Sequence, residues 1–564
     1  MKKIFSLLLI GSIASALSCL TGCIDEVEPT SGATQDKVDK SLSAKEGLLW
    51  GMPSFENVYE VSTTQHFDWG LGSIMHIRDV LTEDLAVASS NYDHYRRWEI
   101  NQYLGKDYVF AGFPWVFYNK WVQTANKAIG NIPEEGAIGI ELGYIGAAHA
   151  FRALIYLDMA RMYEYLPCKA TSSKNLEGND VLGLTVPIVT ENTTEEEAKN
   201  NPRATHQEMF DFIEKDLNKA EELIENLTVN NPVLPNLDVV YGLKARLYMW
   251  HAGYLEEIGD IAEKGIDAGE SSEKEPLDIR ISDAYKNAEK YAHMVIERGR
   301  YAPITKDQWL STTTGFNTPN EAWMLSCQAV KENDVVQSGI LNWTSWMCNE
   351  TAYGYAAAGA MSCVGKSFYE RIPDNDFRKL SWVAPARKLK RQNTFVDPEF
   401  EELDPYVSLK FRPGMGNFTD YQIGSATAIP LMRVEEMYFI EAEAAAHQDV
   451  ERGKKLLQDF MRQYRIDSYS LAFSDKEGVI EEIVFQKRVE LWGEGQTFFD
   501  IKRLNYSVTR HYEETNFQDA AQFNTDGRPA WMNFVISRNE EANNRGVKDW
   551  NNPDPSETEI IPKD

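Results

Sequence analysis

Basic residues are scarce in this chain of 564 residues. It contains 57 Lys and Arg against 86 Asp and Glu, which gives a formal net charge of −29. Proteins that bind nucleic acid through its phosphates need a basic face, so the excess of acid argues against that class. Hydrophobic residues still make up 43% of the chain and charged residues 25%, which is the composition of a protein that buries a core.

Common enzyme motifs are also absent. The chain has no His-Glu-x-x-His zinc motif, no Walker phosphate loop and no Gly-x-Ser-x-Gly elbow. None of its nine histidines has another within four residues, and the acidic run 397–404 does not have the spacing of an EF-hand calcium loop. We therefore predict no catalytic residue, no metal ligand and no cofactor, while calcium binding by the acidic run stays open.

Long apolar runs are limited to the N-terminus. Lys2 and Lys3 precede an apolar run at 4–10, which is the pattern of an export signal and is too short for a comfortable membrane span. The signal ends in Leu-Thr-Gly-Cys, which resembles the bacterial lipobox. We predict that residues 1–22 are removed, that Cys23 carries the lipid anchor and that 23–43 form a flexible tether. A plain signal peptide with a chance cysteine is the alternative.

Cysteine is rare in the remainder of the chain. The mature protein would keep Cys168, Cys327, Cys348 and Cys363, and none of them belongs to a Cys-x-x-Cys motif. Outside the cytoplasm these four residues can pair in three ways, and the sequence does not choose between them. Buried free thiols are the alternative.

Helical periodicity, in contrast, is abundant. Apolar residues recur at helical spacing in eight segments, and Thr205 with Glu208 forms a capping box at the start of one of them. The predicted helices are 113–131, 141–165, 205–223, 237–255, 283–299, 431–447, 451–465 and 475–495. Short gaps favour antiparallel hairpins, and some hairpins begin about 30 residues apart, near the length of a tetratricopeptide repeat. We predict a mainly α fold built as a tetratricopeptide-like scaffold of helical hairpins.

The helical pattern fades between about 301 and 427. Gly, Asn, Thr and Pro interrupt short apolar runs there, and loops of this length in a packed protein are commonly functional. We predict a long insertion of irregular loops and short strands, which belongs to a single domain over 44–564. The polar final stretch, 505–564, is expected to wrap the surface.

Two segments near the C-terminus resemble the signature of a known family. They read Leu431-Met-Arg-Val-Glu-Glu-Met-Tyr-Phe-Ile-Glu-Ala-Glu-Ala-Ala-Ala446 and Lys487-Arg-Val-Glu-Leu-Trp-Gly-Glu-Gly-Gln-Thr-Phe-Phe-Asp-Ile-Lys-Arg503. Both are similar to segments of the SusD/RagB family, the lipid-anchored nutrient-binding proteins of Bacteroidota. The lipobox agrees with this resemblance, and so do the segments 121–126, 151–161 and 534–544.

The resemblance covers nearly the whole mature chain and is weakest between 165 and 430. Ala147, Ala148 and His149 replace a more polar start, and Asp459 stands where Asn is common. The signature charges, among them Arg433, Glu435, Glu490 and Arg503, are interpreted as pairs between packed helices that fix geometry.

The resemblance also implies a function. The protein would be anchored by lipid at the outer membrane and face the cell exterior. It would capture an oligosaccharide or polysaccharide and deliver it, without catalysis, to a SusC-like TonB-dependent transporter. The RagB branch of the family implies peptide as an alternative ligand. A glycoside hydrolase that uses a pair of carboxylates is a third and disfavoured hypothesis.

Aromatic residues gather in two loop clusters that could form the ligand site. A sugar has flat C–H faces and hydroxyl-rich edges, so we expect exposed rings beside side chains that form hydrogen bonds. The first cluster contains Tyr92, Tyr95, Arg96 and Trp98, and the second contains Trp309, Asn342, Trp343, Trp346, Tyr353 and Tyr355. Both clusters lie in parts of the chain from which the family draws its glycan site. Core packing is the alternative for each ring.

Overall fold

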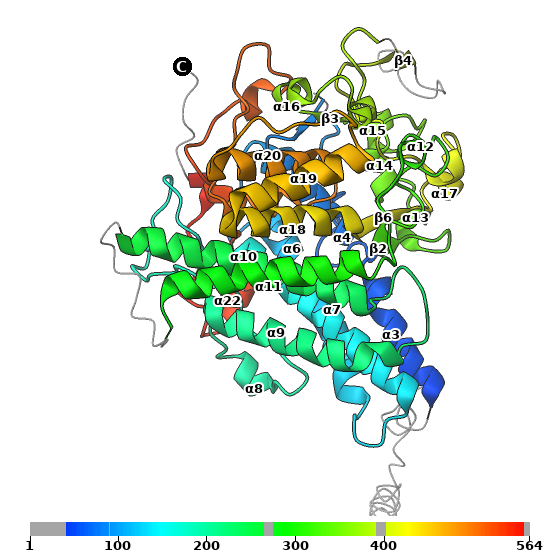
Figure 1. Ribbon diagram of the computed structural model, residues 1–564. Coiled ribbons are helices and arrows are strands. Elements are labelled where there is room, and N and C mark those ends of the chain that lie inside the picture. Colours follow the sequence, from blue (N-terminus) through cyan, green and yellow to red (C-terminus); the bar gives the residue numbers. More distant parts are fainter. Residues whose placement is uncertain (1–40, 89–90, 264–274, 388, 391–401, 558–564) are drawn as a thin grey trace, which may run out of the picture.

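Long helices lie side by side and form the scaffold of the molecule (Figure 1). This computed structural model describes residues 41–88, 91–263, 275–387, 389–390 and 402–557. The long helices are α3 (Leu42–Phe55), α6 (Val109–Asn131), α7 (Gly139–Tyr163), α9 (His206–Leu223), α10 (Leu237–Glu263), α11 (Leu277–Glu297), α18 (Val434–Gln448), α19 (Val450–Tyr464) and α20 (Lys476–Glu490). α6 packs on α7, α7 on α9, α10 on α11, and α11 on α18, which also contacts α19 and α20. The mainly helical, tetratricopeptide-like scaffold is confirmed.

All eight predicted helices form, and local chemistry sets their ends. Before α9, the Thr205 side chain accepts a hydrogen bond from the Glu208 N–H, while the Glu208 carboxylate accepts from Thr205, as the capping box predicts. α20 ends five residues before the predicted 495. Gly493 and Gly495 adopt φ values of 75° and 67°, a left-handed conformation that breaks the helix before α21 (Thr497–Arg503) begins.

The predicted insertion consists of short helices and paired strands beside the helical stack (Figure 1). Its helices include α12 (Lys306–Trp309), α13 (Asp334–Gln337), α14 (Trp343–Met347), α15 (Gly354–Ala357), α16 (Lys366–Arg371) and α17 (Tyr421–Gly424). Three antiparallel strand pairs are present among the described residues: β1 (Leu85–Val87) with β3 (Ser362–Val364), β2 (Trp323–Gln328) with β6 (Ala428–Arg433), and β4 (Leu389–Lys390) with β5 (Glu402–Leu403). The pairing of β1 with β3 brings the chain segment that follows β1 next to the insertion.

The signature charges pair inside the core, as predicted. The Glu490 carboxylate accepts hydrogen bonds from Arg465 (Nη2 to Oε1, 2.7 Å), Arg378 (Nη1 to Oε2, 3.0 Å) and Arg433 (Nη1 to Oε1, 3.2 Å). Burial alone would raise the pKa of Glu490, but these guanidinium groups hold that pKa well below its ordinary value. The network therefore connects α20, α19, β6 and the insertion through one carboxylate.

The final stretch does more than wrap the surface. Arg510 is fully buried and donates hydrogen bonds to the carbonyl oxygens of Val80, Thr82 and Glu99. The buried Trp531 donates to the carbonyl oxygen of Leu81. Polar composition predicted a surface segment here, but these two side chains enter the core because they satisfy carbonyls left open after α4 (Leu71–Val80).

The four described cysteines form no disulfide bond. Cys168, Cys327, Cys348 and Cys363 are free thiols, and the last three are buried, so the structure favours the alternative to disulfide pairing.

Within the described ranges, no helix combines the length and the apolar character that crossing a bilayer requires. The predicted signal, Cys23 and most of the tether lie outside the described residues, and α3 begins two residues before the predicted domain start.

Candidate ligand site

The two predicted aromatic clusters meet in space, although about 250 residues separate them in the chain. The Tyr95 ring meets the Trp346 ring edge to face, with centroids 4.8 Å apart and an interplanar angle of 88°. Trp346 then stacks on Tyr355 at 4.3 Å and 15°. The pairing of β1 with β3 accounts for this meeting, because β1 precedes the first cluster and β3 follows Tyr355.

Two histidines continue this stack outward. The His94 ring lies 5.1 Å from Tyr355, and the His66 ring lies 4.7 Å from His94 and 5.6 Å from Tyr355. The Tyr355 hydroxyl is hydrogen-bonded to His66 Nδ1. Both histidines are half-buried, and Tyr92 nearby in the chain is 56% exposed. We call these two histidines and Tyr355 the rim; its exposed atoms belong mainly to His66 and His94, because Tyr355 is only 7% exposed.

Six rings of the two predicted clusters are not exposed. The expectation that they offer open faces for stacking is wrong, because all six are buried: Tyr95, Trp98, Trp309, Trp343, Trp346 and Tyr355. Rings of this size bury about 150–250 Å² each, so their packing in the core stabilises the fold. Trp98 packs on Phe67 and Phe110, Trp309 on Phe316, and Trp343 on Phe411, with centroid separations of 4.9, 4.9, 4.8 and 5.1 Å.

The polar members of the clusters also have structural partners. Asn342 is the N-cap of α14 and accepts a hydrogen bond from the Ser345 N–H at 3.0 Å. The half-buried Tyr353 donates to the carbonyl oxygen of Asn417 at 3.2 Å. Arg96 donates to the side-chain oxygen of Gln518, which anchors the first cluster to the C-terminal stretch. Of the predicted residues, Tyr92 is the most exposed at 56%, and Tyr355 contacts the partly exposed His66 and His94.

Sequence reasoning missed both histidines of the rim. His94 lies inside the first cluster, and its position between Asp93 and Tyr95 was the available signal. His66 precedes α4 and had no signal, because only the folded chain brings it to His94. Burial lowers the pKa of His94, and the charge of His66 lowers it further. Burial raises the pKa of Tyr355 to about 12, so its hydroxyl keeps its proton at neutral pH.

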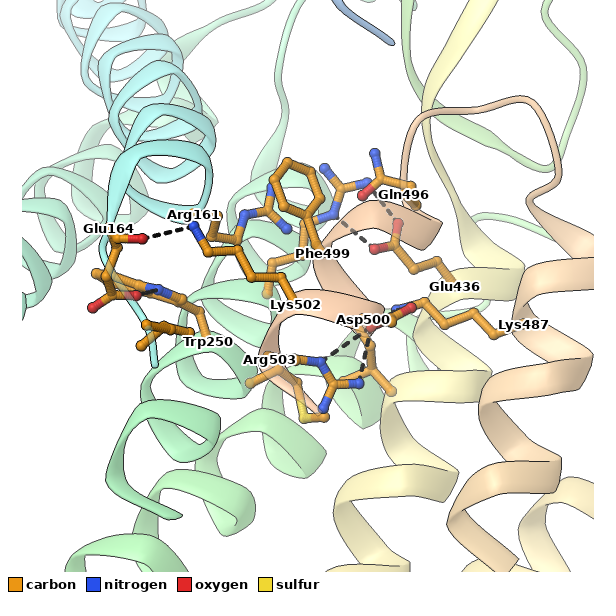
Figure 2. A pocket seen from close by; sticks show the side chains of 14 residues that line it. Arg161, Glu164, Trp250, Glu436, Lys487, Gln496, Phe499, Asp500, Lys502 and Arg503 are labelled. Atoms are coloured by element: carbon orange, nitrogen blue, oxygen red, sulfur yellow. Dashed lines mark hydrogen bonds and ion pairs between the residues drawn. The ribbon is translucent and has the colours of Figure 1, made fainter. Parts of the chain in front are cut away.

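A small cavity lies within the helical scaffold, between α7, α10, α18 and α21 (Figure 2). Its free space is about 30 Å³, enough for one or two water molecules and too small for a sugar ring. Its charged walls are already paired: Arg246 Nη2 lies 2.6 Å from Glu436 Oε2, and Lys487 Nζ lies 3.0 Å from Asp500 Oδ2. This cavity belongs to the ion network of the scaffold.

No group of three or more His, Cys, Asp or Glu side chains in the described part of the chain is placed to hold a metal ion. The class of this protein is defined by a stacked helical scaffold and by loops that hold a stack of mostly buried aromatic rings. Two family models match the chain: "SusD family" over residues 406–555 and "Starch-binding associating with outer membrane" over residues 65–249. The chain belongs to the SusD/RagB family.

Solved structures share the fold. A SusD-like carbohydrate-binding protein from Bacteroides vulgatus is 21% identical, with a TM-score of 0.67 over 90% of this chain and 97% of that one. A SusD superfamily protein from Bacteroides thetaiotaomicron is 17% identical, with a TM-score of 0.63 over 93% and 100%. A laminarin-binding SusD-like protein is 14% identical, with a TM-score of 0.59 over 89% and 98%. No curated protein sequence matches the chain.

Proposed function

We propose that this protein binds an oligosaccharide or polysaccharide at the rim, with Tyr92 beside it. The observation that carries the proposal is the aromatic stack, in which two clusters far apart in sequence converge on His66, His94 and Tyr355. The family description as starch-binding and the laminarin-binding structural neighbour support a glycan as the ligand.

The stack suits this role because it fixes the rim before a ligand arrives. Trp346 lies against the inner face of Tyr355 and is itself held by Tyr95, so Tyr355 has little freedom to lose on binding. The rim offers two partly exposed imidazoles, whose ring nitrogens can donate or accept hydrogen bonds with sugar hydroxyls. The buried Tyr355 hydroxyl is hydrogen-bonded to His66 Nδ1 and holds that ring in place. The small area of the rim predicts modest affinity per sugar unit, in the range of about micromolar to millimolar.

Titration calorimetry of the mature protein against a glycan panel and a peptide panel tests this function. We expect at least one oligosaccharide to bind and no release of reducing sugar from it during incubation. Binding of peptides without binding of any glycan would favour the peptide hypothesis instead. Release of reducing sugar by the purified protein would favour the hydrolase hypothesis.

The lipid anchor and the partner are parts of the same proposal. The protein is held at the outer membrane through Cys23, faces the exterior and passes the glycan to a SusC-like TonB-dependent transporter. Support comes from the lipobox and from the family description as associating with the outer membrane. Several acyl chains on one cysteine bind a bilayer stably, since each buried methylene contributes about 0.8 kcal/mol.

Cys23→Ala is expected to abolish acylation and to release the protein from the membrane fraction. Fatty-acid labelling and membrane fractionation measure both effects. Cys168→Ala is the matched control, because Cys168 is a half-exposed free thiol, and this variant should remain labelled and membrane-bound. A Cys23→Ala protein that stays tightly bound to membranes would contradict the anchor.

A further inference from the structure

The two rim histidines differ from four of the other described histidines in their partners. Four histidines elsewhere in the described chain each contact a carboxylate at 2.6–3.1 Å: His149 with Asp216, His206 with Glu164, His293 with Glu441 and His447 with Glu256. His66 and His94 instead face each other and Tyr355. Neither forms an ion pair with any described carboxylate, although the chain carries an excess of 29 acidic charges.

The arginines that follow His94 also lack a carboxylate ion pair among the described residues. Arg96 donates to the Gln518 amide oxygen, and Arg97 donates to that of Gln102 at 2.6 Å. The Arg97 guanidinium also lies over the Tyr103 ring, 4.8 Å from its centroid. The two guanidinium groups are thus held by neutral amide oxygens, on the chain segment that carries His94.

Burial raises the pKa of both acidic groups of the same segment. Burial, and then the charge of Asp93, raise the pKa of Glu99 to about 8, so Glu99 is mostly protonated at neutral pH. Burial raises the pKa of Asp93 to about 6, although the Tyr95 N–H and Arg96 oppose this. The segment therefore becomes more positive as the pH falls from neutral toward 6, on a protein whose net charge is strongly negative.

Two further titratable groups that lie near the rim in the described part of the chain, Asp68 and His76, are buried. Asp68, two residues after His66, accepts hydrogen bonds from the N–H groups of Ser62 and Thr63 at 2.7 and 2.8 Å, and burial raises its pKa. From α4, the buried His76 lies behind the stack, and burial lowers its pKa to about 3. From α14 and α15 come Trp346 and Tyr355, which are uncharged.

We infer that the rim recognises an acidic group on its glycan, either the carboxylate of a uronic acid or a sulfate ester. His66 and His94 would donate hydrogen bonds to the acidic oxygens, and Arg96 and Arg97 would attract the charge. Two imidazoles side by side, with no acid to partner them, form a site that an anion completes. This inference rests on the proposed glycan-binding function and adds the chemical class of the ligand.

The inference has a pH signature with a definite sign. In the free protein, burial and the charge of His66 depress the pKa of His94, so His94 binds a proton weakly. An anion beside the ring favours the protonated form, so binding takes up a proton. Affinity therefore rises as the pH falls, by up to about tenfold per pH unit for each proton taken up. A neutral sugar has no such dependence on His94.

Calorimetry with matched ligands tests the inference. The probes are oligogalacturonide, alginate and chondroitin sulfate oligosaccharides, each paired with its carboxyl-reduced or desulfated counterpart, at about pH 7.5 and about pH 5.5. We expect one acidic oligosaccharide to bind about tenfold or more tightly than its neutral counterpart and to bind more tightly at the lower pH. The loss of affinity on carboxyl reduction, compared with the loss on desulfation, identifies which acidic group the protein binds.

Variants separate recognition from folding. His66→Gln with His94→Gln should reduce the affinity for the acidic ligand to that of its neutral counterpart. His511→Gln is the control, because His511 is half-buried and contacts the Gln522 amide oxygen elsewhere. If the double variant does not fold, the inference is still tested on the native protein, by its affinity at the two pH values and for the acidic and neutral ligand of each pair. Equal binding of acidic and neutral ligands would overturn the inference alone, whereas no binding of any oligosaccharide would overturn the proposed function as well.

Discussion

Glu490→Gln is expected to lower the free energy of unfolding by about 3–5 kcal/mol. The buried Glu490 carboxylate is the common acceptor for Arg378, Arg433 and Arg465, and removal of its charge leaves three desolvated guanidinium groups short of one counter-charge. Denaturant unfolding followed by circular dichroism measures this loss.

The control for this prediction is a surface pair. Glu222 contacts Lys219 at 3.2 Å, and its side chain is 63% exposed. Glu222→Gln should change the free energy of unfolding by less than about 1 kcal/mol, because water screens such pairs. A Glu490→Gln protein as stable as this control would mean that the network contributes little to the fold.

Trp346→Ala is expected to cost about 3–5 kcal/mol in the free energy of unfolding and to abolish detectable ligand binding. Trp346 is 1% exposed and its Nε1 has no hydrogen-bond partner, so the loss comes from packing and from the cavity that remains. Tyr355 loses the ring that supports it, and the rim loses its geometry as a result.

Trp550→Ala provides the matched control, because Trp550 is 41% exposed. This variant should unfold within about 1 kcal/mol of the native protein and bind the same ligand with the same affinity. Thermal unfolding and calorimetry on both variants measure the two effects. Normal ligand affinity in a folded Trp346→Ala protein would contradict the role given to the stack.

The helices could be predicted from sequence because most of them are amphipathic. α9 buries Met209, Ile213 and Leu217 on one face, and this pattern is visible in the chain. α4 was missed because it is buried on every side, so its sequence carries no contrast between two faces. α3 was missed in part because its start overlaps the polar segment interpreted as a tether.

The candidate site could be predicted only by region. The two aromatic clusters were found, but sequence does not tell which ring faces the core and which faces solvent. That division depends on the pairing of β1 with β3, a contact between segments more than 270 residues apart. Single histidines such as His66 carry no pattern, so the rim became visible only when the fold brought its three side chains together.

The account's central claim is that the glycan binds at the rim. A crystal structure of the protein with the oligosaccharide that binds most tightly in the panel tests this claim most directly. We predict a sugar within hydrogen-bond distance of His66 or His94, at about 2.6–3.2 Å. A sugar bound elsewhere on the molecule, with the rim in contact only with water, would contradict it.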